Sequence, residues 1–368
     1  MKHYITVCAF FALALLTSCR GGGSDRLPDG GDTLTTTSTL LTMVDHGDMI
    51  TADIADPWNQ GQYAGRYALV KRGSDVAIPD GYQRVEVPVR SMAVFSSVHG
   101  SAFEELGDAP LIVAVADGAY VTTPTLVDGL RSGRVRDVGS SMSPSLEMLV
   151  ELSPDAVVAT PGGGADHSAI AKSGIAVVEM ADYMESTPLG RAEWIKLLGA
   201  LTGKEAEATR IFDGVKASYD SISASVDTSK RPMVLTETEY SGVWYVPGGK
   251  SYMARLISDA GGKTIAPDDE SAGSLSFDYA RVYDLGHDAD VWLIRTDHDM
   301  TLAELAAANK LNAKFRCWQD GNVFACNTLT TTFFNDIAFH PERILSDYSR
   351  IIGGRETDNL RYFKKLEK

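Results

Sequence analysis

Residues 194–222 read WIKLLGALTGKEAEATRIFDGVKASYDSI, and this stretch decides the fold. Its apolar side chains recur at steps of three, four and seven residues, the spacing of one buried helix face: Trp194, Leu198, Leu201, Ala208, Phe212, Val215, Tyr219 and Ile222. We therefore predict a connecting helix over 188–228, with a kink or restart where Thr202 and Glu205 have the spacing of a capping box. At ~1.5 Å per residue, about 35 helical residues extend ~50 Å, which is long enough to run along two domains.

Short apolar runs alternate with helical segments on both sides of this helix. Before it, buried-strand runs lie at 111–116 and 156–159, and after it they lie at 233–237 and 291–295. This alternation is typical of a largely parallel sheet. The sequence therefore predicts an α/β protein with two Rossmann-like lobes joined by one long helix. The lobes would span 43–187 and 229–368. Because residues 43–83 alternate in short runs broken by Pro and Gly, they are predicted to add a β-hairpin to the first lobe.

The N-terminus has the features of a targeting segment. Lys2 and His3 precede an apolar run from Ile5 to Leu16, which is too short to span a membrane but suits a signal peptide over 1–18. The small residue before Cys19 resembles the lipobox of bacterial lipoproteins, so Cys19 is the expected lipidation site; the alternative is an ordinary signal peptide with an incidental cysteine. Residues 19–42 are rich in Gly, Ser, Thr and Asp and are predicted to form a flexible tether. No later apolar run reaches eighteen residues, so we expect anchoring without a membrane span.

Two cysteines lie in the predicted second lobe. Cys317 and Cys326 flank a turn signal at Asp320-Gly321, which leaves two alternatives open: a disulfide across the turn, or two buried thiols. With no nearby pair of histidines, the two cysteines make a poor metal site.

Charge and motifs exclude several functions. The 368 residues carry 49 Asp and Glu against 34 Lys and Arg, a net charge of −15 that argues against nucleic acid as a partner. Residues 248–251 and 261–264 resemble phosphate loops, but the position of the required upstream glycine holds Trp244 or Ile257. No nucleophile elbow or zinc-protease motif occurs. Residues 297–299, Asp-His-Asp, group a histidine with two acids but are expected to form a solvated loop. With the common motifs also missing, we predict no catalytic residue, no metal site and no cofactor.

Polar and aromatic residues follow the predicted strands, where open α/β sheets bind ligands. In the first lobe they include the glycines at 162–164 and the candidates Ser97, His99, Tyr120 and Tyr183; in the second they are Trp244, Tyr245 and Arg295. Each alone also fits a turn or rim residue. Two adjacent aromatics beside a Pro-Gly-Gly turn are hard to bury on both faces of a strand, so the rings of Trp244 and Tyr245 are predicted to stack on a planar or macrocyclic ligand.

Four blocks of sequence carry a family resemblance: 145–158, 191–205, 242–253 with 260–262, and 341–347. In order and spacing they resemble the substrate-binding lipoproteins of ABC transporters for iron chelates and cobalamin, over about residues 84–355. The resemblance implies the class III periplasmic binding protein fold and a ligand held between the lobes. It also implies a monomeric receptor in the periplasm, lipid-anchored and with surface exposure left open, that serves an ABC permease of the inner membrane.

The resemblance also assigns docking acids. In this family one acid on each lobe contacts arginine on the permease, and the matching positions are Glu147 and Asp278. The usual second residue is Glu, and the helix after Asp278 is longer than usual. The family's ligand contacts vary with the ligand and carry over to this chain by position only.

We therefore predict a receptor and not an enzyme. Arg295 with neighbouring amides favours an anionic ferric siderophore or haem, and the rings of Trp244 and Tyr245 suit cobalamin, which ranks next. A continuous connecting helix predicts only small closure on binding. The alternatives are an extracytoplasmic enzyme such as a metal chelatase or hydrolase, which needs two converging titratable groups, and a surface adhesion lipoprotein, which needs no deep cleft.

Overall fold

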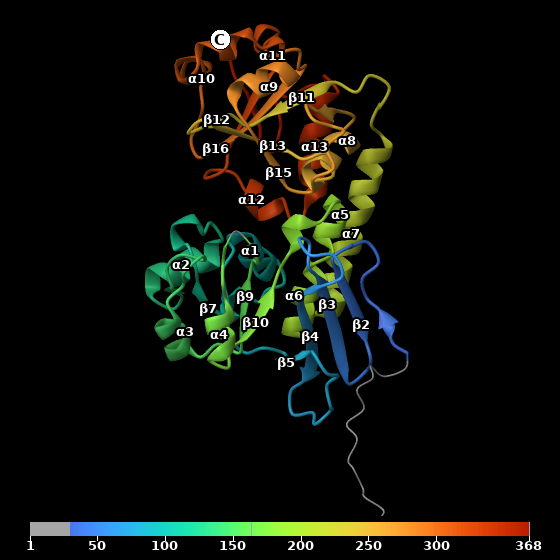
Figure 1. Ribbon diagram of the computed structural model, residues 1–368, viewed down its shortest axis with the longest axis vertical. Coiled ribbons are helices and arrows are strands. Elements are labelled where there is room, and N and C mark those ends of the chain that lie inside the picture. Colours follow the sequence, from blue (N-terminus) through green and yellow to red (C-terminus); the bar gives the residue numbers. More distant parts are fainter. Residues whose placement is uncertain (1–29, 163, 368) are drawn as a thin grey trace, which may run out of the picture.

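The computed structural model describes residues 30–162 and 164–367 (Figure 1). The predicted signal peptide and Cys19 lie outside these residues. No helix within the described part of the chain is both long and apolar enough to cross a membrane.

The described part of the chain begins with a five-stranded sheet, not a single hairpin. Its strands lie side by side in chain order, antiparallel except for the parallel last pair. They are β1 (Asp32–Thr33), β2 (Leu41–Asp45), β3 (Met49–Ala55), β4 (Tyr63–Lys71) and β5 (Gln83–Val87). The prediction of a flexible tether up to residue 42 is therefore wrong for its last part, because β1, β2 and the segment between them are built into the fold.

Two buried carboxylates explain why this Thr-rich segment is ordered. Glu193 is completely buried, and its oxygens accept hydrogen bonds from the backbone N–H groups of Thr36, Thr37 and Ser38 at 2.7–3.1 Å. The ammonium group of Lys196 lies 2.9 Å from the same carboxylate. Burial alone would raise the pKa of Glu193, but Lys196 and the three amides hold it below its usual value.

Glu185 is the second carboxylate and is also completely buried. It accepts hydrogen bonds from the amides of Thr39 and Leu40 at 3.0–3.2 Å and from the hydroxyl groups of Ser38 and Thr39. The indole N–H of Trp194 donates to it at 3.0 Å. A buried charge persists only when hydrogen bonds replace its water, so segment 36–40 is fixed by the two acids.

The first lobe contains a five-stranded, fully parallel sheet in the order β10-β9-β6-β7-β8. Its strands are β6 (Met92–Val94), β7 (Ile112–Val115), β8 (Arg136–Asp137), β9 (Ala156–Ala159) and β10 (Ala176–Glu179). Its helices are α1 (Ser97–Glu105), α2 (Pro124–Ser132), α3 (Leu146–Leu152) and α4 (Ser168–Lys172), with short 3₁₀ turns η1 (Ala109–Leu111), η2 (Gly118–Tyr120) and η3 (Asp182–Met184).

The connector consists of three helices and not one. They are α5 (Pro188–Ala192), α6 (Ile195–Thr202) and α7 (Glu205–Ala224), and α7 runs from beside the first lobe to beside the second (Figure 1). Gly203 ends α6 in the left-handed region, with φ of 73°, which a continuing helix cannot contain. The Thr202 hydroxyl donates to the carbonyls of Leu198 and Gly199 at 3.3 Å instead of capping α7, so the predicted restart occurs but the predicted capping box does not.

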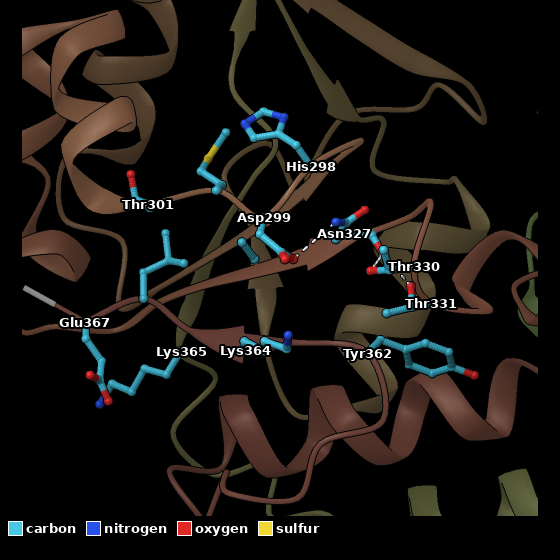
Figure 2. A pocket seen from close by; sticks show the side chains of 13 residues that line it. His298, Asp299, Thr301, Asn327, Thr330, Thr331, Tyr362, Lys364, Lys365 and Glu367 are labelled. Carbon is cyan, nitrogen blue, oxygen red and sulfur yellow. Dashed lines mark hydrogen bonds between the residues drawn. The ribbon is translucent and has the colours of Figure 1, made fainter.

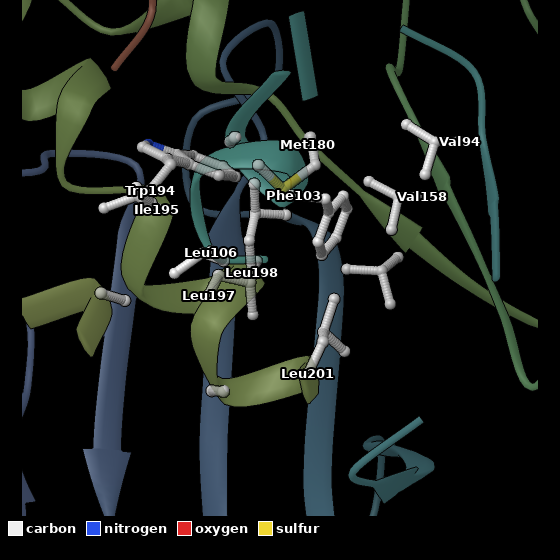
Figure 3. Close-up of a cluster of buried hydrophobic side chains, with 14 of the residues drawn as sticks. Val94, Phe103, Leu106, Val158, Met180, Trp194, Ile195, Leu197, Leu198 and Leu201 are labelled. Carbon is white, nitrogen blue, oxygen red and sulfur yellow. The ribbon is translucent and has the colours of Figure 1, made fainter. Parts of the chain in front are cut away.

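One hydrophobic core joins the N-terminal sheet, the first lobe and α6. Figure 3 shows Leu198 and Leu201 of α6 next to Phe103 of α1, with strand residues Val94 and Val158 beyond them. Side chains of β2 to β5 belong to the same cluster of buried residues. The N-terminal sheet is thus part of the first lobe and not an appended domain.

The second lobe has a mainly parallel sheet in the order β14-β11-β16-β17-β18, with β18 antiparallel, and a small antiparallel sheet β12-β13-β15. The strands are β11 (Met233–Thr236), β12 (Glu239–Tyr240), β13 (Val243–Pro247), β14 (Lys263–Thr264), β15 (Ser274–Phe277), β16 (Val291–Thr296), β17 (Val323–Asn327) and β18 (Lys364–Lys365). The helices are α8 (Tyr252–Asp259), α9 (Tyr279–Gly286), α10 (Leu302–Ala308), η4 (Lys310–Lys314), α11 (Arg316–Gln319), α12 (Phe333–Asp336) and α13 (Pro341–Ile352).

Of the two alternatives for the cysteines, the structure has free thiols. Both Cys317 and Cys326 are buried and unpaired with each other. Burial raises the pKa of Cys317 to about 12 and that of Cys326 to about 11, so both stay protonated and unreactive at neutral pH.

We predict that Glu193→Gln destabilises the protein strongly. The variant removes the charge opposite Lys196 and turns an N–H donor toward backbone N–H groups, which should cost about 3 kcal/mol or more. Thermal unfolding followed by circular dichroism measures the change. Glu151→Gln, on the exposed end of α3, is the matched control and should melt like the wild type. Equal melting of the two variants would contradict this account of the buried carboxylate.

Candidate ligand-binding cleft

The two lobes meet again beyond the connector, where α12 packs on α1. The hydroxyl of Ser101 donates to the backbone carbonyl of Asn335 at 2.8 Å, and that of Thr122 donates to the Asn335 side chain at 2.8 Å. Phe339, which follows α12, is 2% exposed and belongs to the hydrophobic core of the first lobe. The lobes are therefore held together on this side as well as by α7.

His340 adds an ionic contact between the lobes. Its Nε2 lies 2.5 Å from a carboxylate oxygen of Glu105 in the first lobe, and its Nδ1 lies 3.0 Å from Glu342. Burial lowers the pKa of His340, but the two carboxylates outweigh burial and raise it to about 9. At neutral pH the side chain is therefore a buried cation paired with two acids.

A cavity of about 240 Å³ lies between the lobes. The first lobe contributes Tyr183 and Met184, from η3. The second lobe supplies the rest of the lining: Glu237, Tyr245, Val246, Pro247, Ser251, Tyr252, Met253, Ala272, Gly273, Ser274 and Arg295. A cavity with walls from both lobes, beyond the carboxyl ends of β11 and β16, is where an open α/β sheet binds its ligand.

The charges in this cavity cancel. Arg295, at the end of β16, donates from Nε to a carboxylate oxygen of Glu237 at 2.6 Å, and its terminal nitrogen contacts the same oxygen. Burial alone would lower the pKa of Arg295, but the nearby charge of Glu237 raises it above the usual value. Glu237 follows β11 with a φ of 60°, an uncommon backbone conformation that aims its side chain at Arg295. The sequence predicted that Arg295 favours an anionic ligand, but in the structure its charge is already paired with Glu237.

Three tyrosines give the cavity its chemistry. Tyr183 donates its hydroxyl to the carbonyl of Pro161 at 2.8 Å, and burial raises its pKa. Tyr245 is 51% exposed. The ring of Tyr252 lies under the guanidinium group of Arg191, 4.7 Å from its centroid. The cavity thus offers aromatic faces and phenol groups around an internally neutralised ion pair.

Trp244 does not line the cavity, and its predicted ligand role is wrong. The ring is 1% exposed, stacks on Trp292 at 5.8 Å and donates its N–H to the carbonyl of Thr236 at 2.8 Å. Successive residues of a strand face opposite sides. In β13 the neighbouring Tyr245 faces outward while Trp244 enters the core.

The other candidates of the first lobe also lie outside this cavity. His99 is 1% exposed, and its Nε2 lies 2.9 Å from Asp182, which also accepts from Arg191 Nε at 2.9 Å. Burial alone would raise the pKa of Asp182, but the charge of Arg191 and the contact with His99 lower it to about 2. Ser97 is half-buried at the start of α1, and Tyr120 is 69% exposed on η2. The structure therefore brings together Tyr183, Tyr245 and Arg295 only.

Sequence reasoning missed Glu237, Tyr252, Met184 and Met253. Tyr252 and Met253 begin α8 directly after Ser251, whose hydroxyl caps the helix by accepting from the Ala254 N–H at 3.1 Å. This capping residue marks the start of a helix, so the sequence could have placed Tyr252 and Met253 in its first turn, beside the strand ends. No sequence signal marks Glu237, because its role depends on an arginine 58 positions away.

A larger cavity of about 450 Å³ lies wholly in the second lobe (Figure 2). It opens between the ends of β16 and β17 and the edge strand β18, where Asn327 donates to Asp299 at 3.1 Å. The neighbouring His298 is exposed and lies 2.9 Å from Asp297. Within residues 30–162 and 164–367, no group of three or more His, Cys, Asp or Glu side chains could hold a metal ion.

The predicted docking acids are both exposed. Glu147 lies in the first turn of α3, which Ser145 caps by accepting from the Met148 N–H at 3.3 Å. Asp278 is itself the N-cap of α9 and accepts from the Arg281 N–H at 2.7 Å. Residues 274–277 form β15, and α9 begins directly after Asp278.

Two α/β lobes, a helical connector and a cavity between the lobes define the class III type of solute-binding protein. The chain belongs to the periplasmic binding protein family, which it matches over residues 95–327. Proteins of this family that handle iron chelates, haem and cobalamin are substrate-binding components that work with ABC permeases, and they are not enzymes.

A relative and two solved structures illustrate the similarity. An uncharacterized lipoprotein of Methanocaldococcus jannaschii is 27% identical over 307 residues, which cover 77% of this chain and 73% of the relative. A periplasmic binding protein from Veillonella parvula has a TM-score of 0.63 at 11% identity, covering 84% of this chain and 100% of that chain. A periplasmic haem binding protein from Pseudomonas aeruginosa has a TM-score of 0.59 at 17% identity, covering 76% and 99%.

We predict a pH-dependent stability that His340 causes. The folded protein holds the His340 proton up to a pKa of about 9, whereas an unfolded histidine loses it near about 6.5. The stabilisation is therefore complete below pH ~6.5 and is lost as pH rises to ~9.

The melting temperature of the wild type should accordingly fall toward that of His340→Gln across this pH range. His287→Gln, at an exposed site on the far end of α9, should keep the wild-type profile. A constant difference between wild type and His340→Gln would contradict the prediction.

Proposed function

We propose that the chain is the substrate-binding lipoprotein of an ABC importer, which captures a metal chelate between its lobes and delivers it to the permease. The observation that carries this proposal is the cavity lined by Tyr183 from one lobe and by Tyr245, Tyr252 and Arg295 from the other. A ligand that touches both walls would join the lobes, which is how a receptor can present a loaded form to a partner. We also propose that Cys19 carries the lipid anchor.

A ferric siderophore or haem is the first choice of ligand. Aromatic faces stack on a planar macrocycle, phenol groups donate hydrogen bonds to carboxylates or catecholates, and a tyrosine oxygen can approach ferric iron. The Arg295–Glu237 pair has no net charge, so it contributes hydrogen bonds and not a strong preference for anions. Cobalamin or another corrinoid ranks next, because the aromatic and thioether lining suits its apolar edge.

The alternative functions have less support. An enzyme such as a chelatase or hydrolase needs two titratable groups with separated pKa values, but the one carboxylate in the cavity, Glu237, is tied to Arg295. A surface adhesion lipoprotein has no need of a cavity with walls from both lobes.

A ligand titration tests the proposal. The purified protein is titrated with haemin, ferrioxamine and cyanocobalamin while Trp fluorescence is followed. Because each stacked ring contributes about 1 kcal/mol beyond burial, Tyr245→Ala should weaken binding of the true ligand roughly fivefold to tenfold at an unchanged melting temperature. Tyr240→Ala is the matched control, since this tyrosine is 77% exposed on β12 and does not line the cavity.

Trp244→Ala distinguishes a binding role from a core role. Removing this buried ring should cost about 3–5 kcal/mol of stability. The proposed site is wrong if Tyr245→Ala binds as the wild type does, and the receptor function is wrong if the wild type binds none of the chelates.

Docking on the permease is tested with variants that keep the local fold. Glu147→Gln and Asp278→Asn remove each charge, and Asn keeps the hydrogen bond that caps α9. We expect normal ligand affinity in solution but reduced uptake in cells, with the larger effect at Glu147, because truncating a desolvated interfacial charge pair can cost ~2–5 kcal/mol. Asp278→Ala would confuse the test, since losing the cap costs about 1 kcal/mol by itself. Normal uptake by the double variant would exclude these acids from docking.

A further inference from the structure

The loop between β3 and β4 presents a tryptophan next to the cleft. This loop lies outside the region that matches the family. Asp56 fixes it, because the carboxylate accepts from the N–H groups of Trp58 at 2.8 Å and Asn59 at 3.0 Å, and from the Asn59 side-chain amide at 3.0 Å. The Asp56 N–H in turn donates to the carbonyl of Gln62 at 2.9 Å. The position of Trp58 is thus set by the loop itself.

The indole of Trp58 packs against a glycine that follows β9. A Cβ atom on Gly162 would lie 2.7 Å from two ring carbons of Trp58 and 2.8 Å from the hydroxyl oxygen of Tyr183. Gly162 also has a φ of 93°, so this close approach requires glycine. Trp58, Gly162 and Tyr183 therefore meet at one point, and Tyr183 lines the interlobe cavity.

The N-terminal sheet is fixed to the same part of the cavity wall. Glu185, two residues after Tyr183, binds segment 38–40. The Tyr67 hydroxyl, in β4, accepts a hydrogen bond from the backbone N–H of Glu179 at 2.9 Å, on the strand that leads to Tyr183. Trp58 and Tyr183 thus share one rigid framework, although they lie in distant parts of the sequence.

Two large apolar side chains near this point are exposed. Trp58 is 49% exposed and Met142 is 48% exposed. The methyl group of Met142 lies 3.8 Å from the position that a Cβ atom on Gly164 would occupy. The cavity volume of about 240 Å³ falls below the roughly 300–1,000 Å³ of typical ligand pockets. A chelate held there must therefore also cover the surface beside Tyr183.

We propose that Trp58 contacts the bound chelate, so that the N-terminal sheet forms a third wall of the ligand site and helps to set its specificity. This inference rests on the proposed function. An aromatic ring at this position favours a ligand with a flat, apolar edge, such as a tetrapyrrole, over a compact hydrophilic chelate.

The test uses Trp58→Ala, Trp58→Phe and the control Tyr63→Ala in the full chain. Tyr63 is 52% exposed on β4 of the same sheet and stacks on Arg66. Haemin binding is followed by its own absorbance band, which does not depend on the tryptophan that is removed, and cyanocobalamin is titrated in the same way. We expect Trp58→Ala to weaken binding roughly threefold to tenfold, Trp58→Phe to retain most of the affinity, and Tyr63→Ala to bind as the wild type does.

A second variant guards against a folding defect. Asp56→Ala keeps the Trp58 side chain but removes the hydrogen bonds that fix its loop. Haemin affinity should therefore also fall, at an unchanged melting temperature. The inference is overturned if Trp58→Ala melts and binds like the wild type while Tyr245→Ala loses affinity, which leaves the receptor function intact. If the wild type itself binds neither macrocycle nor ferrioxamine, the receptor function fails and this inference fails with it.

Discussion

Two buried carboxylates hold the first half of this protein together. Glu185 and Glu193 flank the start of the connector, and they take nearly all their hydrogen bonds from segment 36–40 of the N-terminus. Neither charge could be buried without these amides, and the amides would lack partners without the charges. The sheet β1–β5, the loop that carries Tyr183 and the helix α6 are therefore one unit, and a change in any of them reaches the wall of the cleft.

The second half is tied to this unit at two separated places. The helix α7 is one tie, and the segment that follows α12 is the other, since it places Phe339 in the core of the first lobe and His340 beside Glu105. A lobe held at two places can rotate less than a lobe on a single hinge. The small closure expected from the sequence stays a prediction, but its physical basis changes: the connector is broken at Gly203, and tertiary contacts restrain the lobes instead.

Periodicity and turn residues were enough to predict the elements that repeat regularly. The buried-strand runs at 156–159, 233–237 and 291–295 form β9, β11 and β16, because apolar spacing alone determines them. Apart from the break of the connector at Gly203, the errors involve long-range partners. Residues 36–40 have the composition of a linker, and only acids more than 140 positions away make them ordered. Trp244 and Tyr245 look alike in the sequence, and only the register of β13 with β15 decides which ring is buried.

The same limit explains why the candidate site was only partly predictable. Residues that follow strands can be found from the sequence, and Tyr183, Tyr245 and Arg295 were found in this way. What the sequence does not contain is that Glu237 neutralises Arg295, which changes the cavity from a cationic one into a neutral, aromatic one. Affinity for the proposed chelate would then come from ring contacts and phenol groups more than from net charge. Every aromatic side chain that lines the cavity therefore contributes more to ligand selection than it would beside an unpaired arginine. Under our proposal, the same holds for the ring of Trp58, which lies outside the region shared with the family.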